Sequence, residues 1–182
     1  MVNGKLQKEH AIVWIASILF ISLSAHISIT LPISEKGIPF TAQSYVIFVV
    51  AGLLSPRLFL GVIISYLFLG IAGLPVFADG TSGWEKIQGA SGGFLYGFVV
   101  SGVAIAYCLQ NAERPSLSKI ITTMIMGSIL LFICGLGQLA VKFGGEKALE
   151  YGLYPFWKMG LFKAFLAAIT VFGVQRWRSS RL

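Results

Sequence analysis

The stretch Tyr66–Gly83 reads Y-L-F-L-G-I-A-G-L-P-V-F-A-D-G-T-S-G; it begins as an apolar helix and breaks at Gly73-Leu74-Pro75. A second glycine cluster, G-A-S-G-G, follows at residues 89–93. A helix that only crosses lipid does not need such a break, because glycine and proline weaken a helix and release backbone polar groups. Non-helical backbone at membrane depth is tolerated where it is buried in protein or lines a cavity. The stretch therefore predicts a small-molecule pocket in a membrane-embedded helical bundle.

The composition is typical of an integral membrane protein. Of the 182 residues, 56% are hydrophobic and 12% are charged, and the mean hydropathy is +0.82. A water-soluble domain needs more charge on its surface. Because the apolar segments recur along the whole chain, we expect one membrane domain over residues 1–182, with membrane lipid around it.

The apolar segments predict the fold class, an all-α integral membrane bundle of six transmembrane helices. Four segments are long enough to cross a membrane, since a crossing takes roughly 20 residues. The stretch between residues 41 and 74 is interrupted by Ser55-Pro56-Arg57, so we divide it into two short or tilted helices. The expected helices cover approximately residues 10–31, 41–54, 57–73, 91–110, 118–142 and 155–176.

The basic residues predict the orientation in the membrane. An even number of crossings puts both termini on one side, and that side holds every arginine: Arg57, Arg114, Arg176, Arg178 and Arg181. Basic residues are enriched in cytoplasmic loops, so we expect both termini in the cytoplasm and the protein in the cytoplasmic membrane. The net charge of +7 then reflects topology and lipid contact. Nucleic acid is not an expected partner, because the charges form no dense stripe.

Several functional classes lack their signatures in this sequence. There is no G-x-x-x-x-G-K-[ST] phosphate loop, so the chain is not expected to hydrolyse ATP itself. His10 and His26 have no nearby ligand partners, and neither a metal nor a cofactor is expected. A membrane enzyme would need a nucleophile–base pair or a metal cluster in one pocket, and no histidine or cysteine is placed to form one. A ligand-binding transport component or a non-catalytic scaffold subunit fits better.

Two charged residues are candidates for ligand contact. Lys163 lies about two turns into the last helix, where a cation is costly unless it is paired and so marks a functional site. The alternative is a lysine near a helix end whose ammonium reaches the interface. Asp79 lies between the two glycine clusters, and its carboxylate can accept two N–H bonds from a cyclic urea or amide. Its alternative is an ordinary turn residue.

The other candidate ligand-binding residues are polar, aromatic or small. Gln43 either hydrogen-bonds a ligand or caps the second helix. The aromatic residues concentrate towards the outer side, as in an interfacial belt, but Phe77 and Trp84 adjoin the glycine loop and are expected to line the pocket. The glycine clusters add further candidates for ligand contact: Gly73, Ser91, Gly92 and Gly93.

The first helix is rich in small residues, among them Ala11, Ala16 and Ser17. Small residues let another helix approach closely in a bilayer. This pattern fits internal packing, and it equally fits a docking face for another membrane subunit. The spacing does not decide between the two interpretations.

Four stretches of the sequence match the motifs of one family. The block G-L-P-V-F-A at residues 73–78 is the longest and most specific match. Residues 38–43 are similar to the motif V-P-x-T-x-Q, residues 89–95 to G-P-T-G-G-Y-L, and residues 155–164 to P-F-x-P-G-D-x-x-K-A. Over about residues 25–168 the chain thus resembles the BioY biotin-uptake family.

The resemblance implies a six-helix substrate-binding (S) component of an energy-coupling-factor transporter. Such a component binds biotin near its outer side, beneath the loop between its first two helices. It works with a transmembrane T-protein and two ATPase subunits, which agrees with the missing phosphate loop. A biotin site needs aromatic walls, a few polar groups and a cation, and Phe77, Trp84, Asp79 and Lys163 are expected to supply them.

Two departures from the family pattern bear on the ligand. Gly160 stands where the family has an aspartate, and Gln138 stands where it has a tryptophan. We therefore expect Asp79, supported by Gln138, to accept the ureido N–H of biotin, and Lys163 to pair with a carboxylate or a carbonyl. The alternative is a shifted preference, for a biotin precursor or analogue.

Overall fold

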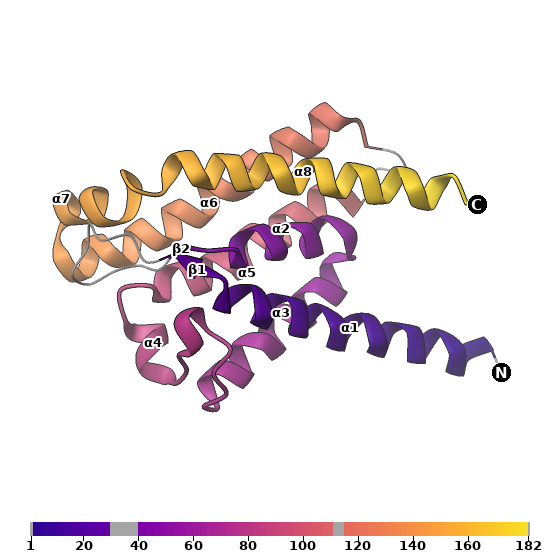
Figure 1. Ribbon diagram of the computed structural model, residues 1–182, viewed down its shortest axis with the longest axis horizontal. Coiled ribbons are helices and arrows are strands. Elements are labelled where there is room, and N and C mark those ends of the chain that lie inside the picture. Colours follow the sequence, from indigo (N-terminus) through magenta and orange to yellow (C-terminus); the bar gives the residue numbers. More distant parts are fainter. Residues whose placement is uncertain (1, 30–39, 111–114, 182) are drawn as a thin grey trace.

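The computed structural model of the chain is a bundle of helices whose long axes run in broadly the same direction (Figure 1). The structure describes residues 2–29, 40–110 and 115–181. Its long helices are α1 (Val2–His26), α2 (Gln43–Leu53), α3 (Pro56–Ile71), α5 (Gly92–Gln110), α6 (Leu117–Phe143) and α8 (Trp157–Ser179). The predicted helical bundle is confirmed.

Short elements connect these helices. Strand β1 (Ser28–Ile29) pairs antiparallel with β2 (Phe40–Thr41). Between α3 and α5 lie the 3₁₀ turn η1 (Ala78–Gly80) and helix α4 (Trp84–Gln88). Helix α7 (Gly145–Ala148) and the π-helical turn η2 (Leu149–Leu153) join α6 to α8.

Within the described ranges, four helical segments are long and apolar enough to cross a membrane: Lys8–His26 of α1, and α5, α6 and α8. Helices α2 and α3 are apolar but shorter, with 11 and 16 residues. Six crossings therefore stay a prediction. Helix α1 also ends earlier than the expected residue 31, because the chain enters β1 at Ser28.

The predicted division between α2 and α3 is confirmed. Ser55 has an extended backbone (φ −66°, ψ 152°), and Pro56 begins α3. Proline suits the first position of a helix because an N–H there has no intrahelical partner, and it also disfavours helical geometry at the residue before it. The local geometry of Ser55 and Pro56 therefore makes the chain turn between α2 and α3.

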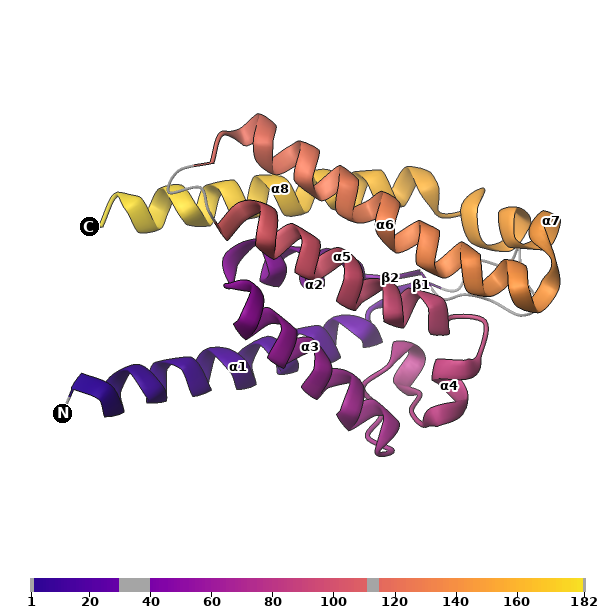
Figure 2. The same ribbon diagram turned by 180° about the vertical axis from the view of Figure 1, so that it is seen from behind.

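Both termini of the described chain lie at one end of the bundle, and both views agree on this (Figures 1 and 2). We call it the terminal end. The opposite end, which we call the distal end, carries α4, α7 and the β1–β2 pair. Helices α5 and α8 begin on the distal side, and α2 follows β2 nearer the middle of the bundle.

Glycines let the helices of the core approach closely. A Cβ on Gly102 of α5 would lie 2.2 Å from the ring of Phe59 on α3, and one on Gly135 of α6 would lie 2.4 Å from the ring of Phe94 on α5. Phe59 is fully buried. Small residues at such crossings allow the close packing that associates helices in a bilayer, where the hydrophobic effect between helices is absent.

Candidate functional site

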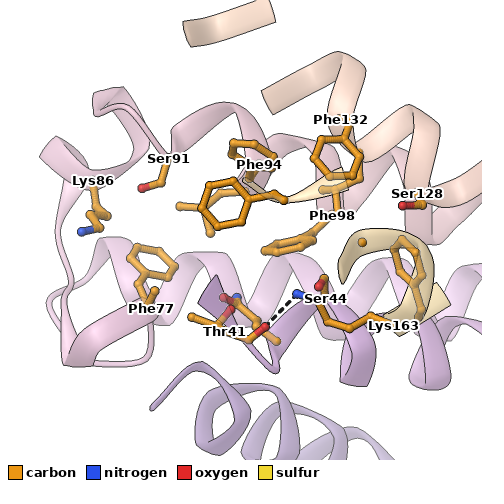
Figure 3. Close-up of a pocket in the computed structure, with 17 residues that line it drawn as sticks. Thr41, Ser44, Phe77, Lys86, Ser91, Phe94, Phe98, Ser128, Phe132 and Lys163 are labelled. Atoms are coloured by element: carbon orange, nitrogen blue, oxygen red, sulfur yellow. Dashed lines mark hydrogen bonds between the residues drawn. The ribbon is translucent and has the colours of Figure 1, made fainter. Parts of the chain in front are cut away.

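A pocket lies in the distal half of the bundle, bounded by α2, α4, α5, α6 and α8 (Figure 3). The space inside its walls, including space open to solvent, is about 820 Å³. The lining residues are Thr41, Gln43, Ser44, Phe48, Phe77, Ala78, Lys86, Ser91, Phe94, Leu95, Phe98, Ser128, Leu131, Phe132, Phe156, Gly160 and Lys163.

Aromatic side chains form much of the pocket wall (Figure 3). The ring of Phe77 is 1% exposed and packs edge-on against Tyr66, with 5.7 Å between ring centroids and 72° between ring planes. Phe94 and Phe132 form a second edge-on pair, at 6.3 Å and 83°. Such pairs hold the rings in defined orientations, and their faces suit a flat apolar ligand.

Lys163 of α8 lines the pocket, and its ammonium group points into the bundle. Its Nζ donates a hydrogen bond of 3.0 Å to the backbone carbonyl of Thr41 (Figure 3). The expected pairing of Lys163 with a carboxylate or carbonyl of a ligand stays a prediction. The bond places the cation where β2 passes into α2, beside Gln43.

Gln43 is the first residue of α2 and is 3% exposed. Its Nε2 donates to the hydroxyl oxygen of Tyr66 at 2.6 Å, and that hydroxyl donates to the backbone carbonyl of Val76 at 2.9 Å. The side chain therefore points into the core and the pocket and does not act as a helix cap. This chain of bonds links α2, α3 and the segment after the glycine break.

Asp79 is exposed and is not among the lining residues. Its backbone has a positive φ of 57°, which aspartate tolerates better than most residues. The Oγ of Ser28 donates to its carboxylate at 2.5 Å, so Asp79 joins η1 to β1. The turn directs the carboxylate to the bundle surface, and this geometry gives no support to the expected contact with a ligand N–H.

Gln138 of α6 hydrogen-bonds backbone carbonyls and not the expected Asp79. Its Nε2 donates to the backbone carbonyls of Ile87, at 3.2 Å, and Gly89, at 2.6 Å. These bonds hold the α4–α5 connection against α6. The expectation that Gln138 supports Asp79 is therefore corrected, because its amide nitrogen bonds carbonyls at the end of α4.

The remaining candidates divide between the pocket and its scaffold. Ser91 lines the pocket, whereas Gly92 and Gly93 pack against α6: a Cβ on Gly93 would lie 2.5 Å from the carbonyl oxygen of Cys134. Gly73 has a positive φ of 104° and serves the turn after α3. Trp84 is 55% exposed on α4 and is not part of the lining.

The small residues of α1 do not share one environment. Ser17 is buried and its Oγ donates to the carbonyl of Val13 at 2.7 Å, so it packs inside the bundle. Ala11 is exposed and Ala16 is partly exposed. The expected loop over the pocket, between α1 and α2, lies largely outside the described residues.

Sequence reasoning missed several lining residues, and their spacing is the signal that could have found them. Phe94 and Phe98 are four residues apart on α5, and Ser128 and Phe132 are four apart on α6. Residues at this spacing share one helix face, so both pairs mark faces turned to a common space. Lys86 on α4 carries no comparable signal.

A model described as the BioY family matches residues 3–180. The "Probable biotin transporter BioY" of Rickettsia prowazekii is 30% identical over 146 residues, covering 80% of this chain and 74% of that protein. The "Biotin transporter BioY2" of Lactococcus lactis subsp. cremoris is 35% identical over 141 residues, covering 75% of each.

A solved structure has the same fold. It is a crystal structure, at 2.1 Å, of the S-component for biotin from an ECF-type ABC transporter. The TM-score is 0.83 at 22% identity, and the match covers 98% of this chain and 94% of that one. The arrangement of helices in this chain is thus that of a fold already solved.

Proposed function

The chain belongs to the BioY family, and we propose that it binds biotin and serves in its uptake across the cytoplasmic membrane. The observation that carries this proposal is the distal pocket, with its aromatic walls and its inward-pointing Lys163. Biotin combines an apolar bicycle, a cyclic urea and a carboxylate tail. A site for it needs flat apolar surfaces, hydrogen-bonding groups and a cation, and the lining contains each of these.

In this proposal Gln43, Phe77, Ser91 and Lys163 contact the ligand. Phe77 packs against the apolar body, Gln43 and Ser91 hydrogen-bond its polar atoms, and Lys163 donates to a carbonyl or carboxylate oxygen. Other candidates shape the pocket from outside: Gly73, Asp79, Gly92, Gly93 and Gln138. Because Trp84 is largely exposed, its contribution would come at the rim.

Uptake of radiolabelled biotin by a biotin-auxotrophic host tests the function. Cells that express the chain are expected to accumulate label, and cells that express the Lys163→Met variant at equal level are not. Equal accumulation by cells without the chain would contradict the proposal.

A biotin precursor or analogue is the second candidate ligand, and one observation favours it. Gly160 lines the pocket where the family has an aspartate, and a Cβ there would lie 2.6 Å from the ring of Phe132. The aromatic wall thus occupies space that a side chain at 160 would need. Competition of unlabelled desthiobiotin against labelled biotin separates the two ligands: stronger competition than by biotin itself would favour the precursor.

We also infer six crossings, with α2 and α3 as short, tilted ones and with the terminal end in the cytoplasm. The arginines at the start of α3 and in the last turn of α8 support this orientation. In a background without Cys108 and Cys134, Ser180→Cys and Glu146→Cys probe the two ends. A membrane-impermeant maleimide is expected to label only the cysteine at position 146 in intact cells; labelling at position 180 would contradict the orientation.

A transmembrane T-protein and two ATPase subunits are the proposed partners, since the sequence has no phosphate loop of its own. We place the docking face on α1, at Ala11 and Ala16, which are at least partly exposed. The Ala11→Leu variant is expected to lose co-purification with the partner subunits. Ile12→Leu, at a neighbouring exposed position, is the matched control. Loss in both variants, or in neither, would contradict this face.

A further inference from the structure

We infer that Tyr66 is a positioning residue, which fixes the side-chain amide of Gln43 so that its carbonyl oxygen is the acceptor for an N–H group of the ligand. The inference rests on the proposed function, because the N–H group is that of a cyclic urea. The carbonyl oxygen of Gln43 then takes the place of the carboxylate that is missing at Gly160.

The direction of the hydrogen bonds follows from the chemistry of the three groups. A phenol has one hydrogen, and the carbonyl of Val76 can only accept, so the hydroxyl hydrogen of Tyr66 goes to Val76. The oxygen of Tyr66 must therefore accept from Gln43. Only the Nε2 end of the amide carries hydrogens, which fixes the orientation of the amide.

The opposite orientation would leave a buried group without a partner. With Oε1 towards Tyr66, the hydroxyl would have to give its hydrogen to Gln43, and the carbonyl of Val76 would lose its donor. Tyr66 is fully buried and Gln43 is nearly so, so no bulk water is at hand to replace the lost bond. Leaving a buried acceptor unsatisfied is unfavourable, and this disfavours the flipped amide.

The orientation leaves Gln43 Oε1 available in the pocket. No described residue donates to this oxygen. Within the described ranges, the enclosed side-chain polar atom that has no hydrogen-bond partner is Gln175 Oε1, so Gln43 Oε1 retains accessible surface. Since Gln43 lines the pocket and is otherwise buried, that surface faces the pocket.

The other lining groups do not offer an equivalent acceptor. Among the lining side chains of the described pocket there is no carboxylate, and Gln43 has the one carbonyl oxygen. The remaining polar side chains are hydroxyls, which both donate and accept, and ammonium groups, which only donate: Thr41, Ser44, Ser91, Ser128, Lys86 and Lys163. Among the lining side chains, Gln43 is therefore the dedicated acceptor for a ligand N–H.

Tyr66 itself is not among the lining residues, so its effect on the ligand must pass through its neighbours. One route is Gln43, and the other is the edge-on packing against Phe77. The Tyr66→Phe variant separates these routes, because it keeps the ring and removes only the hydroxyl.

A double-mutant cycle on biotin affinity tests the inference. Gln43→Leu is expected to weaken binding about tenfold or more, and Tyr66→Phe about threefold to tenfold, which is the scale of one hydrogen bond. In the Gln43→Leu background, Tyr66→Phe is expected to have no further effect, since the amide it positions is gone. Additive losses would overturn the inference, because the hydroxyl of Tyr66 would then affect the ligand by a route that does not pass through Gln43.

A second readout does not depend on biotin. The side-chain amide resonance of Gln43, assigned by its absence in Gln43→Leu, is expected to shift in Tyr66→Phe of the ligand-free protein. An unchanged resonance would overturn the positioning role. A wild type that binds no biotin would instead refute the proposed function, and the resonance would then decide by itself whether Tyr66 holds the amide.

Discussion

The Gly70→Ala substitution tests how the pocket wall is held in place. Gly70 does not line the pocket, but it faces the ring of Phe77, which does line it. A Cβ at this position would lie 2.1 Å from Cζ and 2.3 and 2.7 Å from the two Cε atoms. The closest approach is about 1.3 Å short of the 3.4 Å at which ordinary contacts begin.

The ring of Phe77 has little freedom to move away. Tyr66 packs edge-on against it, and the ring is 1% exposed, so the open space beside it is the pocket. Overpacking of this kind typically costs about 1–3 kcal/mol. We therefore expect Gly70→Ala to lower the apparent melting temperature and to weaken biotin binding about tenfold or more, because the displaced ring occupies ligand space.

The assay is thermal unfolding and calorimetric titration of the detergent-solubilised variant. Gly137→Ala is the matched control: Gly137 lies within α6 and a Cβ there has nothing within 4 Å. Alanine at that position removes only glycine's helix penalty of about 1 kcal/mol, so neither stability nor affinity should fall. Wild-type affinity and stability in Gly70→Ala would refute the reasoning about the wall.

Substitutions at three other positions separate ligand contact from scaffold. Lys163→Met is expected to weaken biotin binding at least a hundredfold in titrations; unchanged affinity would remove Lys163 from the site. Gln138→Leu breaks two hydrogen bonds to backbone carbonyls and should lower the free energy of unfolding by about 1–3 kcal/mol. An unchanged melting temperature would contradict this scaffold role of Gln138. Asp79→Asn keeps an acceptor for Ser28 and tolerates a positive φ, so it should bind biotin like the wild type, whereas Asp79→Ala should be less stable; loss of binding in Asp79→Asn alone would restore Asp79 as a ligand contact.

The features that the sequence predicted well are those with local physical causes. Pro56 ends one helix and starts the next through its own geometry, wherever the rest of the chain lies. The break at Gly73 follows in the same way, since that glycine adopts a positive φ. Lys163 was found because a cation in an apolar helix needs a partner, and it has the carbonyl of Thr41.

The features that the sequence missed depend on directions set by tertiary packing. Asp79 directly follows the lining residues Phe77 and Ala78 in the sequence, but its turn directs the carboxylate to Ser28. Gln138 bonds the backbone carbonyls of Ile87 and Gly89, and the availability of a backbone carbonyl leaves no signature in residue types. Gln43 was named as a candidate, yet the orientation of its amide depends on Tyr66, which is 23 residues away.

Calorimetric titration of the purified, detergent-solubilised protein with biotin tests the central claim, that the distal pocket is a biotin site, most directly. The wild type is expected to bind one biotin per chain, the Lys163→Met variant to lose most of that affinity, and Gly137→Ala to bind as the wild type does. A folded wild type that shows no heat of binding, or a Lys163→Met variant that binds equally well, would contradict the claim.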